Sequence, residues 1–109
     1  MTLVDLERFE EAKSLFRRMI PVARRVLGET DEVTLRMKSH YACGLYDDPA
    51  ATLADLREAV TTLEETERTA RRVLGGAHPR TVGLVGCLRE ARVVLRTREA
   101  GKKVVFVKK

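Results

Sequence analysis

Apolar residues recur along most of the chain at intervals of three and four positions, which is the period of an amphipathic helix. One such stripe spans Leu6 to Leu27 and a second spans Leu53 to Leu74, and a shorter pattern follows each of them. The pattern predicts an all-α fold with four main helices, at about 4–27, 31–46, 51–74 and 79–98. The connections between these helices are short, so sequence neighbours are expected to pack antiparallel.

The two long stripes are copies of one another. A shift of 47 residues superimposes the strings RRVLGETDEVTL, from Arg24, and RRVLGGAHPRTV, from Arg71. It also places the stripe of the first copy (Leu6, Phe9, Lys13, Phe16, Ile20, Ala23, Leu27) on that of the second (Leu53, Leu56, Val60, Leu63, Glu67, Ala70, Leu74). The sequence therefore predicts a repeated structural unit, with Leu27 and Leu74 buried at corresponding helix ends.

Local signals mark where these helices end and begin. Gly28 and Gly75 close the two long helices, at a position that favours a positive φ angle. Asp31 is a strong N-cap for the next helix in the first copy, and His78-Pro79 stands at the same place in the second. Each copy is therefore expected to be a long helix, a tight turn and the start of another helix.

One residue conflicts with this pattern. Pro21 lies inside the first long helix, where it cannot donate a hydrogen bond to the carbonyl group of Arg17. A kink or a break is expected near Met19–Ile20. After the turn at Asp47–Pro49, Thr52 and Asp55 offer a capping box for the third helix.

The string VLGGAHPRT, from Val73 to Thr81, resembles the end of a tetratricopeptide repeat of the kinesin-light-chain type, and VLGETDEVT, from Val26, resembles the same motif without His-Pro. The likeness covers residues 6–98 and implies an array of antiparallel helix pairs, one complete repeat flanked by two halves. The unit is longer than the usual ~34 residues. Arg89 also stands where the family has a small residue, which is a departure that disfavours close helix packing at that point.

The resemblance implies a non-enzymatic scaffold that binds a protein or peptide segment on a concave face. In such proteins the first helix of each repeat lines that face. Position by position, the partner-binding residues would be Arg36, Ser39, His40 and Cys43 on one helix and Gly83, Gly86, Cys87 and Glu90 on another. Self-association through exposed terminal helices is a further expectation, because short repeat arrays need their ends covered.

The distribution of charge adds an alternative function. The chain has 109 residues and a net charge of +5, which arises from −1 over residues 1–50 and +6 over residues 51–109. We expect a helical domain at 1–100 and a basic tail at 101–109. The basic end could bind an anionic partner such as nucleic acid, through Arg89, Arg92, Arg96, Arg98, Lys102, Lys103, Lys108 and Lys109. No aromatic interleaving accompanies these residues, so a protein partner is favoured.

The candidate chemistry is sparse. The sequence has no glycine-rich phosphate loop, and its two serines, Ser14 and Ser39, both fall in predicted helices. Two His and two Cys match the count for one zinc ion, but His78 and Cys87 lie too far apart along one helix, and no C-x-x-C occurs. We therefore expect no enzyme activity, no metal and no cofactor. The two cysteines are expected to be reduced thiols, and no apolar run is long enough to span a membrane. Both features favour a cytoplasmic location.

Overall fold

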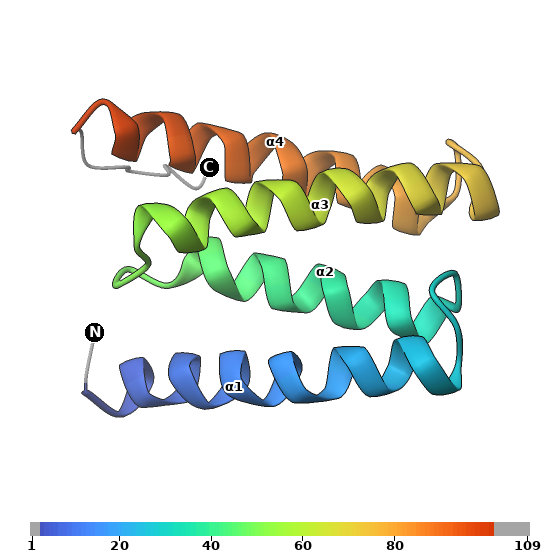
Figure 1. Ribbon diagram of the computed structural model, residues 1–109. Coiled ribbons are helices and arrows are strands. Elements are labelled where there is room, and N and C mark those ends of the chain that lie inside the picture. Colours follow the sequence, from blue (N-terminus) through green and yellow to red (C-terminus); the bar gives the residue numbers. More distant parts are fainter. Residues whose placement is uncertain (1–2, 102–109) are drawn as a thin grey trace.

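The computed structural model describes the backbone of residues 3–101 and the side chains from residue 7 onward. Four helices follow one another with alternating direction: α1 (Leu3–Val26), α2 (Glu32–Asp47), α3 (Leu53–Leu74) and α4 (Pro79–Glu99). Each helix packs against the next, and α2 also packs against α4 (Figure 1). The described residues contain no strand. The predicted all-α array of helix pairs is therefore confirmed, and the basic tail lies outside the described residues.

The predicted signals operate at the helix ends. Gly28 has a φ angle of 103° and Gly75 one of 94°, values that residues other than glycine rarely adopt. The Asp31 carboxylate accepts a hydrogen bond from the Val33 amide at 2.8 Å. His78 caps α4 in the same manner, because its Nδ1 accepts from the Arg80 amide at 3.1 Å. The two copies therefore share one local mechanism for turning the chain.

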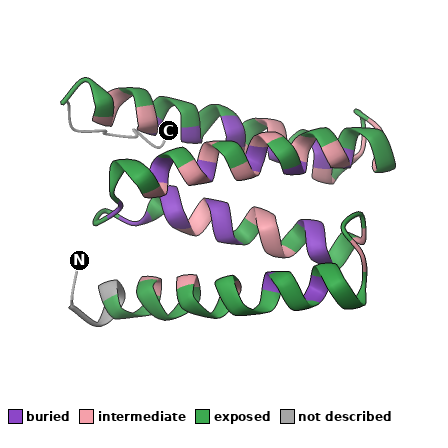
Figure 2. Cartoon of the chain, in the orientation of Figure 1, coloured by how far each residue is buried: buried purple, intermediate pink, exposed green. Residues whose placement is uncertain are grey.

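The core lies between α2, α3 and α4 and receives only the inner edge of α1. Leu35 and Ala42 of α2 are fully buried, as are Leu56 and Leu63 of α3. Leu84, Leu88, Ala91 and Val94 complete the core from α4. Figure 2 shows that α1, by contrast, is exposed along most of its length, with Ile20 and Ala23 as its buried residues among those described.

Two expectations about α1 need correction. Leu27 is 48% exposed and lies beyond the end of α1, so the prediction that it is buried is wrong. Its counterpart Leu74 is partly buried and packs against the core. The difference arises because α3 lies between α2 and α4, whereas α1 has a described helix on one side only. Pro21 does not break α1, which runs without interruption to Val26. A kink there stays a prediction.

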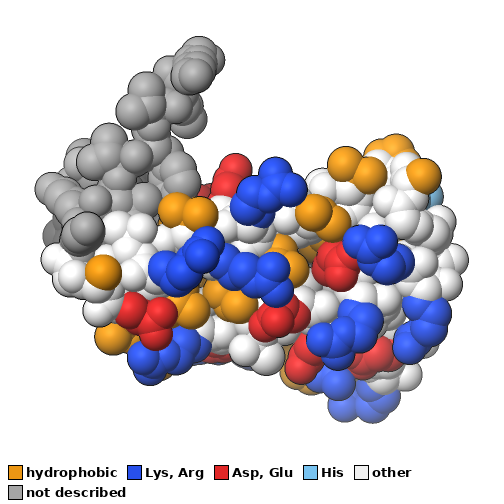
Figure 3. All heavy atoms as spheres, turned by 90° about the horizontal axis from the view of Figure 1, so that it is seen from above, with side chains coloured by type: hydrophobic (Ala, Val, Ile, Leu, Met, Phe, Trp, Pro, Cys, Tyr) orange, Lys and Arg blue, Asp and Glu red, His pale blue; other side chains and the backbone are white. Residues whose placement is uncertain are grey.

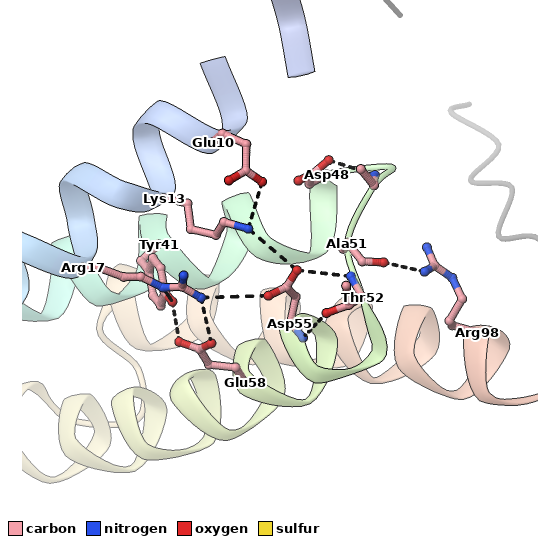
Figure 4. Close-up of polar contacts among 11 residues, drawn as sticks. Glu10, Lys13, Arg17, Tyr41, Asp48, Ala51, Thr52, Asp55, Glu58 and Arg98 are labelled. Atoms are coloured by element: carbon pink, nitrogen blue, oxygen red, sulfur yellow. Dashed lines mark hydrogen bonds and ion pairs between the residues drawn. The ribbon is translucent and has the colours of Figure 1, made fainter. Parts of the chain in front are cut away.

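A polar network fixes α1 against α2 and α3 (Figure 4). Arg17 Nε donates to the Tyr41 hydroxyl at 2.9 Å, and that hydroxyl donates to the Glu58 carboxylate. Lys13 Nζ lies 3.8 Å from Asp55, which completes the predicted capping box with Thr52. The hydrogen bond to Tyr41 raises the pKa of Arg17 further above its ordinary value, and burial raises the pKa of Tyr41. These three helices are thus held in one register by side chains from each.

Candidate functional site

Helices α2 and α4 lie side by side, and the contact between them forms the centre of the candidate site. Cys43 Sγ lies 3.5 Å from Cys87 Sγ, and the Tyr46 hydroxyl donates to Glu90 Oε2 at 3.0 Å. Both pairs join residues 44 positions apart in the sequence. Three of the eight predicted partner-binding residues therefore gather at this contact between the two helices.

Cys43 and Tyr46 act at this contact as neutral hydrogen-bonding side chains. Burial, together with the contact to Cys87, raises the pKa of Cys43 to about 12. Burial and the neighbouring Cys43, Cys87 and Glu90 groups also raise the pKa of Tyr46 above its ordinary value. A thiol that stays protonated is a poor nucleophile and a poor metal ligand. The geometry here favours packing and recognition over covalent chemistry.

A second link between α2 and α4 lies toward their N-terminal ends. Arg36 NH2 lies 3.9 Å from Glu32 Oε1, and Arg80 NH2 of α4 lies 3.2 Å from the same oxygen. The Arg36 side chain keeps about half of its surface exposed, at 52%. Since surface ion pairs contribute little to folding, typically below about 1 kcal/mol, the Arg36 guanidinium is available to a partner.

Small side chains leave open space along the same face. Gly83 and Gly86 are exposed on α4, and a Cβ atom added at either would meet no heavy atom within 4 Å. Ser39, half-buried on α2, is another short side chain of the predicted set. The backbone of α4 is therefore accessible to an incoming chain at these glycines.

His40 is placed differently from the other predicted residues. It is exposed and lines a hollow of about 480 Å³ between α1 and α2. The opposite wall comes from α1 and includes Phe9, Ala12 and Phe16. The face therefore continues from the meeting line of α2 and α4, past Arg36 and His40, to the edge of α1.

The contribution of α1 to this surface was not predicted. Phe9 and Phe16, which line the hollow, belong to the apolar stripe that predicted this helix. A stripe predicts that a helix face packs, but it does not predict where two packed helices leave a hollow between them.

Comparisons with known proteins agree with this architecture. A family model described as tetratricopeptide repeat matches residues 1–32, which comprise α1 and the turn that leads into α2. The match supports a tetratricopeptide repeat, a kind of unit that builds interaction surfaces from stacked helix pairs. No curated protein and no solved structure matches the chain. Within residues 3–101, none of the helices is long and apolar enough to cross a membrane.

Proposed function

We propose that this chain is a non-enzymatic, scaffold-like module that binds a segment of a partner protein on the face formed by α2 and α4. The observation that carries the proposal is the parallel alignment of these two helices, linked through Cys43–Cys87 and Tyr46–Glu90. Repeat arrays present such surfaces to extended or helical segments of other proteins. The helix-end motif at Val73–Thr81 supports the kinesin-light-chain type of repeat, and a cytoplasmic location belongs to the same proposal.

The character of the face suggests what it would bind. Arg36 and His40 supply positive or hydrogen-bonding groups, Glu90 supplies a carboxylate, and Gly83 and Gly86 allow close approach of a backbone. A peptide with both an acidic side chain and small or extended neighbours would satisfy these groups. With only two such helices the area is small, so the affinity of the single chain should be in the micromolar range, about −8 kcal/mol or weaker.

The test begins with a peptide library displayed on phage and selected against the immobilised chain. Binding of a selected peptide is then measured by fluorescence anisotropy. Arg36→Glu combined with His40→Glu should weaken binding by about tenfold or more, equivalent to about 1.4 kcal/mol. Arg68→Glu with Arg72→Glu introduces the same number of carboxylates at exposed positions of α3 and should leave binding unchanged. Equal binding by both double variants would contradict the proposed face.

Substitutions of the two glycines separate folding from binding. Gly83→Ala and Gly86→Ala lie inside an exposed stretch of helix with free space around them, so each should stabilise the chain by about 0.5–1 kcal/mol. Gly86→Leu should keep the fold yet weaken peptide binding, because its side chain would occupy the proposed approach path.

The alternative function is binding of an anionic partner by the basic end of the chain. Three of the arginines concerned already have internal partners: Arg92 NH2 lies 3.3 Å from Glu64, Arg96 Nε donates to the Arg92 carbonyl at 3.4 Å, and Arg98 NH1 donates to the Ala51 carbonyl at 2.5 Å. Arg89 and Arg96 stay exposed. Binding that falls steeply with salt, and that requires Lys108 and Lys109 rather than Arg36, would favour this alternative.

A further inference from the structure

Among the residues that the structure describes, no helix packs over one apolar stripe on α1, although Ala12 at its N-terminal end also borders the hollow beside α2. The members of the stripe are spaced by three, four, three and four residues: Ala12, Leu15, Met19, Val22 and Val26. All five are exposed, with Leu15 at 49%, Met19 at 41% and Val22 at 40%. Scattered exposed hydrophobic residues are ordinary, but a continuous stripe along one helix marks a contact surface.

The internal repeat shows what such a stripe does when it is covered. A shift of 47 residues places Ala12, Leu15, Met19 and Val22 of α1 on Ala59, Thr62, Thr66 and Thr69 of α3. Ala59 and Thr66 are buried, and Thr62 and Thr69 are half-buried. The exposed face of α1 is thus more apolar than the buried face of its counterpart. Exposure to water does not favour apolar side chains at these positions of α1, whereas burial against a covering helix does.

At the opposite end of the array, α4 also has an uncovered face. Val82, Arg89 and Val93 are exposed on α4, with Val82 at 56%. Their counterparts on α2, at positions 35, 42 and 46, are all buried. Figure 3 looks onto this end, where Lys and Arg side chains are interspersed with hydrophobic ones.

We propose that copies of this chain associate end to end, with α4 of one copy packed against the uncovered stripe on α1 of the next. Helix α4 is the repeat counterpart of α2, and α1 is the counterpart of α3. Within the chain, α2 and α3 pack antiparallel. The contact between copies repeats that pairing and continues the array in the same sense.

Charge complementarity favours a second copy as the occupant. Antiparallel packing places the first half of α1 beside the last half of α4. Residues 3–14 contain four carboxylates, one arginine and one lysine, whereas residues 89–99 contain four arginines and two carboxylates. The two segments thus have opposite net charge, which favours this orientation over its reverse.

Arg89 limits how tight the contact can be. It stands where α2 has the fully buried Ala42, so α4 cannot approach a neighbouring helix as closely as α2 approaches α3. Its aliphatic stem can still cover apolar surface while the guanidinium reaches outward. Glu11, which borders the α1 stripe, is an exposed acceptor for it. The association should therefore be reversible and weakened by salt.

The first experiment is sedimentation velocity on the 109-residue chain from about 1 to 500 μM. A head-to-tail contact that continues the array leaves one α1 and one α4 uncovered at its ends, so the expected result is a ladder of species that grows with concentration, not a single dimer. Raising the salt concentration should shift the ladder toward monomer. A chain that stays monomeric throughout this range would overturn the proposal.

Two end-blocking variants then identify the surfaces. Leu15→Glu with Met19→Glu blocks the stripe on α1, and Val82→Glu with Val93→Glu blocks the uncovered face of α4. All four positions are exposed, so both variants should keep the fold. Circular dichroism would verify this. Each variant alone should be monomeric. An equimolar mixture should form a discrete 1:1 complex and nothing larger, because only one intact α1 and one intact α4 remain.

Other patterns would contradict the contact in distinct ways. If the α4-blocked variant still associates by itself, the contact is between two α1 helices. If the mixture stays monomeric, the two ends do not bind each other. Arg68→Glu with Arg72→Glu, on the outer side of α3, is the matched control and should leave the ladder unchanged. Leu15 and Met19 belong neither to the α2–α4 contact nor to the hollow beside His40, so peptide binding by the α1-blocked variant can succeed or fail independently of self-association.

Discussion

At the scale of single residues, the two thiols form the least expected contact in the molecule. Cys43 and Cys87 are both half-buried, and their sulfur atoms lie 3.5 Å apart. The pKa of Cys43 is raised to about 12, chiefly by burial and then by the contact with Cys87. Because the thiolate is the reactive form, Cys43 should be protected from electrophiles at neutral pH even though its side chain is only half-buried.

Alkylation with iodoacetamide, followed by peptide mass spectrometry, measures this protection. At pH 8 Cys43 in the folded chain should react at least about tenfold more slowly than Cys43 in urea, since far less of it is ionised. Below its pKa the thiolate fraction rises about tenfold per pH unit. The folded-state rate should therefore keep rising between pH 8 and pH 10, and a plateau near pH 9 would contradict the raised pKa.

Residue-level predictions succeeded where the cause was local. Asp31, Thr52 and His78 act as caps because a cap depends on a few neighbouring residues. The meeting of Cys43 with Cys87 could not be predicted, because it depends on how two helices 44 residues apart are aligned. The same limit applies to His40, whose hollow exists only because α1 packs beside α2.

At the scale of elements, the spacing of apolar residues predicted four helices to within two residues at each end. It did not predict which side of a helix has a neighbour. Leu27 and Leu74 occupy the same position in the two copies, yet Leu27 is exposed because no helix of the described part of the chain lies on the outer side of α1. A repeat in sequence therefore implies equivalent burial only where the surroundings also repeat.

This difference predicts unequal effects of truncation. Leu63→Ala removes a fully buried side chain from the centre of α3 and should destabilise the chain by about 2–5 kcal/mol. Leu27→Ala should cost less than about 1 kcal/mol, because half of its surface is already in water. Urea denaturation of both variants would check this, and equal losses would mean that the end of α1 is buried after all.

At the scale of the whole molecule, the four helices form a linear array in which contacts connect neighbours. Helix α3 has α2 on one side and α4 on the other, whereas α1 packs against α2 and, among the described residues, contacts α3 through polar side chains such as Lys13 and Arg17. In such arrays stability is close to a sum over units and their interfaces. The end helix with one interface should therefore open without unfolding the rest.

Hydrogen–deuterium exchange resolved by peptide would reveal this opening. In dilute solution, amides in the middle of α1 should exchange at least about tenfold faster than those in the middle of α3, where Leu56 and Leu63 are fully buried. Arg17, Tyr41 and Glu58 slow the opening, so Tyr41→Phe should accelerate exchange in α1 while leaving α3 nearly unchanged. Equal protection of α1 and α3 would show a single cooperative unit.

If copies associate end to end, protection of α1 should rise with protein concentration, and Leu15→Glu with Met19→Glu should abolish that rise, because the stripe on α1 is the surface that the next copy would cover.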